Sequence, residues 1–186
     1  MPTRLFLVRH AEAERHKDVE EAQWPLSNEG RRQAERLAAD LALLGVDVLW
    51  SSPYPRAVDT VAPFASDHDL EIQIDYDLRE RLFSPIWIDD FEVTLRQAFE
   101  NPDFSLPGGE TSRECQARVL SALERIVQAH PDKTIAVATH GNAIALILGS
   151  LDPDVDFEFW KSIGNPDLFH LEWDGEFRWR REFRLP

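Results

Sequence analysis

The stretch Leu5-Phe6-Leu7-Val8-Arg9-His10 joins a short apolar run to an arginine and a histidine. An apolar run of this length predicts a buried strand. A second run, from Thr134 to Ala138, leads in the same way into Thr139-His140-Gly141. Because ligands bind at the carboxyl edge of an open α/β sheet, we expect His10 and His140 to share one pocket although they are far apart in the chain.

Helices and strands are expected to alternate around these two runs. Between residues 27 and 44, apolar residues recur at helical spacing, with Ser27 as N-cap and Gly45 as terminator. Pro55 begins a second predicted helix, which Pro63 should kink or end. The other predicted elements are strands at 46–50 and 71–74, a long helix capped by Thr111, a strand at 134–139, a helix at 141–148, and a closing hairpin of 168–173 and 177–183.

This alternation predicts an α/β fold with a mostly parallel central sheet, helices on both faces and an antiparallel edge. A chain of 186 residues is most simply a single domain, here residues 1–186. Residues 81–107 mix aromatics, prolines and acids without one clear period. We interpret them as a helical or irregular insertion.

Composition excludes several classes of function. A formal net charge of -14 disfavours nucleic acid as a partner, because binding to phosphate backbones needs a cationic surface. The longest wholly apolar stretch, residues 143–148, is too short to span a membrane. Cys115 is the only cysteine, which excludes an intramolecular disulfide and a cysteine-based zinc site. No secretory signal precedes Arg4, so a cytoplasmic location is expected.

Six short motifs together resemble the histidine phosphatase superfamily, also called phosphoglycerate mutase-like. They follow one another in the order that is typical of that family and extend over most of the chain. The motifs are Leu7-Val8-Arg9-His10-Ala11-Glu12, Leu26-Ser27-Asn28-Glu29-Gly30, Ser51-Ser52-Pro53 with Arg56-Ala57, Leu78-Arg79-Glu80-Arg81, Pro107-Gly108-Gly109-Glu110-Thr111 and Thr139-His140-Gly141.

The resemblance implies a phosphoglycerate mutase-like fold and a role for each matching residue. It makes His10 the nucleophile, Arg9, Arg56 and His140 the phosphate pocket, and Glu80 the proton donor to the leaving oxygen. These residue types suit the chemistry. A phosphoryl group stays charged throughout its transfer and needs cationic donors, while a neutral imidazole is a competent nucleophile. The implied mechanism requires neither a metal nor a cofactor.

Two positions depart from the family pattern. His16 stands where many members have an asparagine that touches phosphate, so we include His16 as a candidate phosphate ligand. Ala11 replaces the glycine that commonly follows the catalytic histidine. Each assignment also has a plainer alternative: an Arg-His pair at a strand end is often a surface pair, and the charge run 77–81 around Glu80 is typical of an exposed salt-bridge cluster.

The same residues are compatible with three functions. The chain is expected to be a phosphoric monoester hydrolase acting on a small phosphorylated substrate. The alternatives are a cofactor-dependent phosphoglycerate mutase and a protein phosphohistidine phosphatase. Between Phe83 and Pro107 there is one basic residue, Arg96, among five acids, which disfavours a polyanionic sugar acid. The insertion also contains aromatic residues such as Trp87 and Phe91, and favours a substrate whose remainder is neutral and partly apolar.

Overall fold

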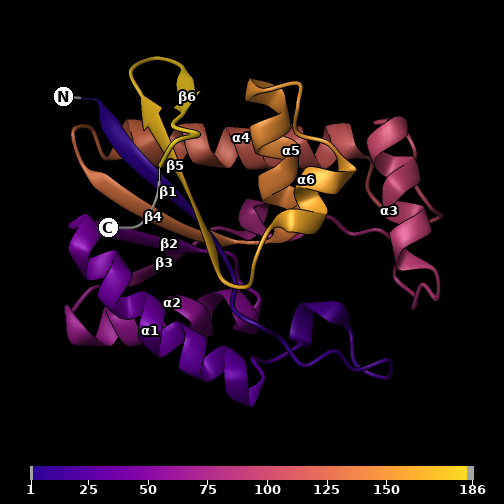
Figure 1. Cartoon of the computed structure of the whole chain (residues 1–186), viewed down its shortest axis with the longest axis horizontal. Coiled ribbons are helices and arrows are strands. Elements are labelled where there is room, and N and C mark those ends of the chain that lie inside the picture. Colours follow the sequence, from indigo (N-terminus) through magenta and orange to yellow (C-terminus); the bar gives the residue numbers. More distant parts are fainter. Residues whose placement is uncertain (1, 184–186) are drawn as a thin grey trace.

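A computed structural model of the protein describes residues 2–183 (Figure 1). Its centre is a six-stranded sheet with the order β3-β2-β4-β1-β5-β6. The first four of these strands run parallel, and β5 and β6 complete the sheet as an antiparallel edge. The strands are β1 (Thr3–Arg9), β2 (Val48–Ser51), β3 (Ile72–Ile74), β4 (Thr134–Thr139), β5 (Asp167–Trp173) and β6 (Phe177–Trp179). The predicted fold class is therefore confirmed.

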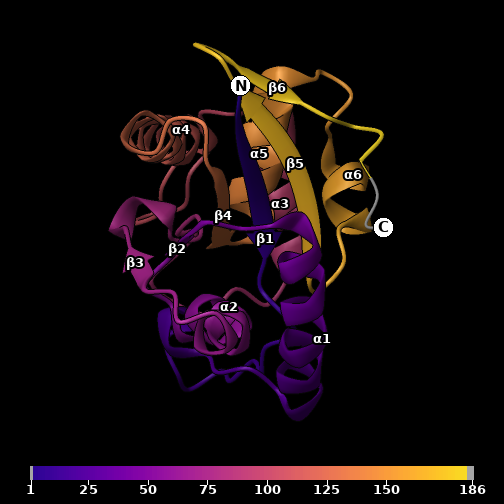
Figure 2. The ribbon, with the colours of Figure 1, turned by 90° about the vertical axis from the view of Figure 1, so that its left-hand side faces the viewer.

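Helices cover both faces of this sheet, as the two views show (Figures 1 and 2). Helices α1 (Asn28–Leu44) and α2 (Pro55–Asp67) lie together on one face. Helices α4 (Ser112–Ala129) and α5 (Gly141–Leu151) cover the other. The shorter helices are α3 (Phe91–Glu100) and α6 (Phe157–Ser162), with two 3-10 turns, η1 (Glu21–Gln23) and η2 (Tyr76–Leu78).

The position of β1 inside the sheet explains why its sequence is continuously apolar. Leu5 and Leu7 point into the core formed with α4 and α5, whereas Phe6 and Val8 pack in the core formed with α1 and α2. All four side chains are at most 1% exposed. A strand that is buried on both faces needs apolar residues at every position, and this fixes β1 in the middle of the sheet.

Local sequence signals correctly predicted where α1 begins and ends and where α4 begins. Ser27 Oγ accepts a hydrogen bond from the Gly30 amide, and Gly45 ends α1 in the left-handed conformation with φ 65°. Thr111 caps α4 in a reciprocal capping box with Glu114. Of the two effects expected of Pro63, a kink or an end of the helix, the second does not occur, because α2 continues to Asp67. Phe64 and Ala65 are buried against the sheet, and this packing outweighs the backbone hydrogen bond that proline cannot donate.

The carboxyl-terminal part differs from expectation in two places. The second strand of the hairpin ends at Trp179 and does not reach Phe183, and α6, which was not predicted, precedes the hairpin. The insertion contains one helix, α3, which packs against α6 around Phe83, Leu95 and Phe157. Within residues 2–183, no helix is both long enough and apolar enough to cross a membrane.

Candidate active site

The sheet register brings the two predicted histidines together. Strands β1 and β4 are parallel neighbours, and Arg9 is paired with Thr139. His10 and His140 therefore leave the sheet side by side, and the His10 amide donates to the Thr139 carbonyl oxygen at 3.1 Å. Their ring centroids are 5.2 Å apart. The site lies at the carboxyl edge of the parallel strands, as expected for an open α/β sheet.

His10 is held with one ring nitrogen free to react. Its Nδ1 lies 2.7 Å from the carbonyl oxygen of Ala11. Because a carbonyl oxygen can only accept, this contact assigns the proton to Nδ1 and leaves the lone pair on Nε2. Arg56 Nε donates to Nε2 at 3.2 Å. Burial, with the nearby Arg56 charge as the next cause, holds the pKa of His10 well below its usual value, so the ring is neutral.

Arg56 lies in the first turn of α2, immediately after Pro55, and only 2% of it is exposed. Besides its contact with His10, it donates through NH1 to the carbonyl oxygen of Glu21 at 2.5 Å and through NH2 to Glu21 Oε1 at 2.9 Å. The guanidinium thus spans from the reactive imidazole to the turn η1. A buried arginine needs such partners, because an unpaired charge in the interior is costly.

Arg9 is the last residue of β1 and directly precedes His10. Its NH1 donates to the carbonyl oxygens of Ile163 and Gly164, and its buried Nε has no hydrogen-bond partner among residues 2–183. The guanidinium lies flat against Gly141, where an added Cβ would be only 2.9 Å from Arg9 Nε. The glycine of the Thr139-His140-Gly141 motif therefore provides the space that Arg9 occupies.

His140 is fully buried between the rings of His10 and Tyr54. Its Nε2 lies 2.8 Å from Ser52 Oγ, which also accepts a hydrogen bond from the Tyr54 amide. The Ser52 hydroxyl can donate its proton to Nε2, and in that tautomer the ring proton lies on Nδ1. That Nδ1 is buried and unpartnered among the described residues. Burial holds the pKa of His140 well below its usual value, so the ring is a neutral donor.

Glu80 is anchored at the amino end of α5. Its carboxylate accepts hydrogen bonds from the backbone amides of Asn142 and Ala143, at 3.1 and 3.0 Å, and from that of Arg81 at 2.9 Å. Among the described residues, the ion pairs of this charge run are made instead by Asp77 and Arg79, with Arg125 and Glu110 among their partners. The alternative interpretation of Glu80 as one member of a surface cluster therefore does not fit the geometry.

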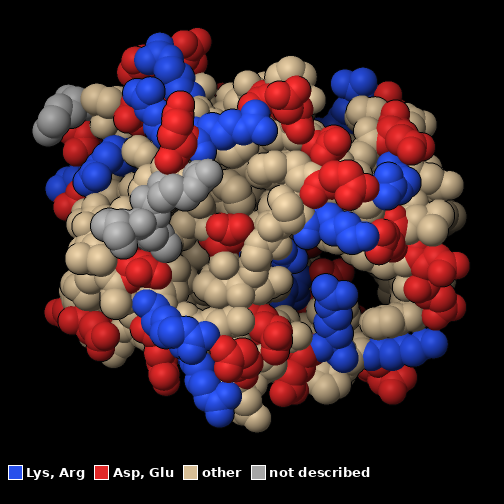
Figure 3. All heavy atoms as spheres, viewed as in Figure 1, with Lys and Arg blue, Asp and Glu red and all other residues tan. Residues whose placement is uncertain are grey.

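Most of these groups line a cavity of about 630 Å³, which we call the main cavity; the fully buried His140 does not form part of its wall. Arg9, His10, Arg56 and Glu80 contribute to its wall. Asn142 does so too, and both polar atoms of its buried side chain lack partners within residues 2–183. The insertion and α6 supply apolar and aromatic wall residues, namely Phe83, Ile86, Trp87, Ile88, Phe91 and Trp160. Figure 3 shows the hollow on this face, with both cationic and anionic side chains around it.

The remaining predicted ligand, His16, is not brought to this wall. Its side chain is half exposed, and its Nε2 lies 3.4 Å from Glu14 Oε2. Its neighbour Arg15 lines the main cavity instead, as does Glu21. Sequence reasoning missed both residues, because the segment that follows the first motif has charges but no periodicity that would orient them.

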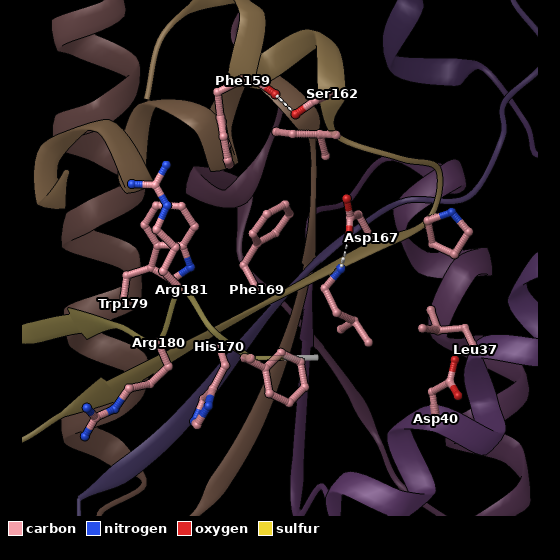
Figure 4. Close-up of a pocket in the computed structure, with 14 residues that line it drawn as sticks. Leu37, Asp40, Phe159, Ser162, Asp167, Phe169, His170, Trp179, Arg180 and Arg181 are labelled. Atoms are coloured by element: carbon pink, nitrogen blue, oxygen red, sulfur yellow. Dashed lines mark hydrogen bonds between the residues drawn. The ribbon is translucent and has the colours of Figure 1, made fainter. Parts of the chain in front are cut away.

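A second cavity, of about 480 Å³, lies beside β5, β6 and α6 (Figure 4). Its wall includes Phe159, Phe169 and Trp179, whose rings contact one another, and none of the predicted site residues. His170 also lines it and stacks on Phe6, with ring centroids 4.6 Å apart. We therefore place the candidate active site in the main cavity.

Residues 5–183 match the family model of the histidine phosphatase superfamily (branch 1). The chain belongs to this superfamily. This membership confirms the family resemblance that the six motifs indicated. The match extends over the whole sheet and includes every residue discussed above as a site candidate.

Its relatives in this superfamily include phosphatases and mutases. The chain is 29% identical to phosphoserine phosphatase 1 of Hydrogenobacter thermophilus over 150 residues, 74% of this chain and 70% of that protein. It is 33% identical to phosphoglycerate mutase-like protein 4 of Arabidopsis thaliana, over 75% of this chain and 67% of that one. A solved mycobacterial glucosyl-3-phosphoglycerate phosphatase shares the fold with TM-score 0.79 and 21% identity, covering 97% of this chain and 98% of its own.

Proposed function

We propose that the protein is a metal-independent phosphatase that hydrolyses a small phosphomonoester through a phosphohistidine on His10. One observation carries this proposal: a buried, neutral imidazole turns its unprotonated Nε2 toward Arg56 and lies near Arg9 and His140. Cationic and neutral donors around such a nucleophile are what an in-line phosphoryl transfer requires.

The reaction then takes two steps. His10 Nε2 attacks phosphorus, the bond from phosphorus to the ester oxygen breaks, and the Glu80 carboxyl gives its proton to the departing oxygen. Water next attacks the phosphohistidine and gives its proton to Glu80, while the phosphorus–nitrogen bond breaks and frees His10. Arg9, Arg56 and His140 Nδ1 donate hydrogen bonds to the nonbridging oxygens in both steps. The same three groups do the work that a metal ion does in other phosphatases.

Hydrolysis is favoured over the mutase reaction by the wall of the main cavity. A mutase must grip a second anionic group while its substrate reorients. The part of the insertion that lines the cavity contributes no lysine or arginine, and its charged residue, Asp89, is anionic. Lys17, which also lines the cavity, lies 3.7 Å from Asp89. A substrate with a neutral, partly apolar remainder fits this wall better than a sugar acid.

Rapid-quench labelling tests the mechanism directly. Wild-type protein incubated with a ³²P-labelled phosphomonoester should acquire a label that is stable to alkali and labile to acid. His10→Ala should abolish both the label and turnover, whereas His68→Ala, at an exposed histidine at the end of α2, should change neither. Label on another residue would refute the assignment.

Two further assays separate the alternatives. Activity should survive dialysis against EDTA, and activity that is lost and then restored by zinc or magnesium would refute metal independence. A panel of phosphate esters should favour aryl and other partly apolar monoesters. Interconversion of 3- and 2-phosphoglycerate as the fastest reaction would instead identify a mutase.

A further inference from the structure

Glu21 contacts the active-site arginine in a way that the family motifs did not indicate. It lies in the turn η1 between the first and second motifs, and it lines the main cavity. Both its carbonyl oxygen and its carboxylate accept hydrogen bonds from Arg56, through NH1 and NH2 respectively. One residue therefore contacts both terminal nitrogens of the guanidinium.

The Arg56 guanidinium is thus contacted along two different edges. The edge formed by the two terminal nitrogens is occupied by Glu21. The Nε edge faces His10, with Nε 3.2 Å from Nε2. Because guanidinium is planar and its five N–H groups are fixed in direction, holding one edge determines where the other points. A phosphoryl group in line with His10 Nε2 would meet the edge that Glu21 leaves open.

The turn that presents Glu21 is itself well supported. The Trp24 indole N–H lies within hydrogen-bond distance of the carbonyl oxygens of His16 and Val19, at 3.2 and 3.1 Å. The Trp24 ring centroid is also 5.8 Å from the Arg56 guanidinium carbon. Tyr54 contacts the same guanidinium at 5.0 Å. Glu21 and two aromatic rings therefore hold the cation, and this is the kind of support that a catalytic group needs in order to stay in place.

We propose that Glu21 is a positioning residue of the phosphate pocket, which holds Arg56 so that its Nε edge faces His10 and the transferring phosphoryl group. This inference rests on the proposed function and assigns a role that the six motifs leave open. It differs from a second possibility, in which the Glu21 carboxylate occupies the place of the phosphate and must leave before substrate binds. The backbone carbonyl of Glu21 favours positioning, because rotation of the side chain cannot remove that contact.

Two substitutions of Glu21 test separately the role of its hydrogen-bond-accepting side-chain oxygen and the role of its negative charge. Glu21→Gln keeps an oxygen that can accept from Arg56 NH2 and removes the charge, and Glu21→Ala removes both. Glu35→Gln is the matched control, because it removes the same charge from an exposed glutamate of α1 that does not line the main cavity. Each variant is assayed for kcat and KM with p-nitrophenyl phosphate, for inorganic phosphate binding by calorimetry, and for Tm.

If Glu21 positions Arg56, Glu21→Ala should lower kcat roughly tenfold or more, because small misplacements of a catalytic group are costly. It should also weaken the binding of inorganic phosphate. Glu21→Gln should retain kcat within about threefold by the same argument, since the amide oxygen keeps the contact. Glu35→Gln should match the wild type in all three measurements.

Three outcomes would overturn the inference. Tighter phosphate binding by both Glu21 variants with kcat retained would show that the carboxylate competes with phosphate. Wild-type kcat in Glu21→Ala would show that Arg56 needs no support from Glu21. A purely structural role would be shown if the lost activity followed a fall in Tm and did not recover in Glu21→Gln. Phosphate binding is measured without turnover, so the inference can fail while labelling of His10 succeeds, and the reverse.

Discussion

Replacing Gly141 with alanine should impair the active site and leave the fold intact. An added Cβ would lie 2.9 Å from Arg9 Nε, 3.1 Å from Cζ and 3.2 Å from NH2. Nonbonded heavy atoms prefer separations of roughly 3.5 Å or more, so the guanidinium must move by about half an ångström. Gly141 is the first residue of α5 and has no positive φ, so alanine adds no backbone strain.

The size of the effect follows from that displacement. A shift of about 1 Å in a catalytic group can cost on the order of 10²-fold in rate. Half that shift should lower kcat/KM about tenfold, equivalent to about 1.4 kcal/mol. The contacted atoms belong to the end of a long side chain, and alanine favours the helix more than glycine does. The melting temperature should therefore stay within about 3 °C of the wild type.

The assay compares kcat/KM for p-nitrophenyl phosphate and Tm in Gly141→Ala and in a control from the same helix. Gly149→Ala serves as that control, because a Cβ there would meet its nearest neighbour, the Val155 carbonyl oxygen, at an ordinary 3.6 Å. Its activity should be unchanged. Gly141→Ala protein with wild-type kcat/KM would refute the reasoning, because Arg9 could then shift without consequence. A large loss of Tm would mean that the clash disturbs the helix and not only the side chain.

Three other predictions concern the same cavity. Burial and the charge of Arg56 lower the pKa of His10, so its neutral form should persist below pH 6.5. An NMR titration should therefore show a protonation midpoint below that pH. A midpoint at or above pH 6.5 would contradict this prediction. Glu80→Gln should slow the hydrolysis of alkyl phosphates much more than that of p-nitrophenyl phosphate, because a poor leaving group depends most on proton donation, and equal losses would indicate positioning alone. Trp87→Ala should raise KM for bulky aromatic esters at least threefold and leave KM for small esters unchanged, because the half-exposed Trp87 ring lines the main cavity. An effect on Tm alone would exclude a role for Trp87 in substrate selection.

The residues at strand and helix ends were the most predictable part of this molecule. Two apolar runs ending in histidine were enough to place His10 and His140 together, because parallel strands bring their carboxyl ends to one edge. Pro55 predicted the first turn of α2, but the place of Arg56 in the phosphate pocket was implied only by the family resemblance. The positions of the two histidines follow from a local signal and one rule about sheets.

Contacts made by loops were not predictable in this way. Glu21 reaches Arg56 across a segment with no hydrophobic period, and the carbonyl oxygen of Ile163 reaches Arg9 from the far end of the chain. Side chains at such positions are oriented by tertiary packing. The insertion shows the same limit, because its composition indicated an apolar lining but not which rings form it. Phe83, Phe91, Phe99 and Phe104 all belong to the small core beside α6, and of these only Phe83 and Phe91 also line the main cavity.

Because Glu80 is anchored to α5, it is structurally independent of the insertion residues that form the aromatic wall of the main cavity. The residue directly precedes the insertion, yet its carboxylate is held by the first amides of α5, the helix that begins immediately after His140. Changes within residues 82–107 can therefore reshape the aromatic wall while Glu80, the proposed proton donor, stays in register with His10, the proposed nucleophile. Under the proposed function, substitutions confined to that single segment can change the substrate preference and leave the two reacting side chains in place.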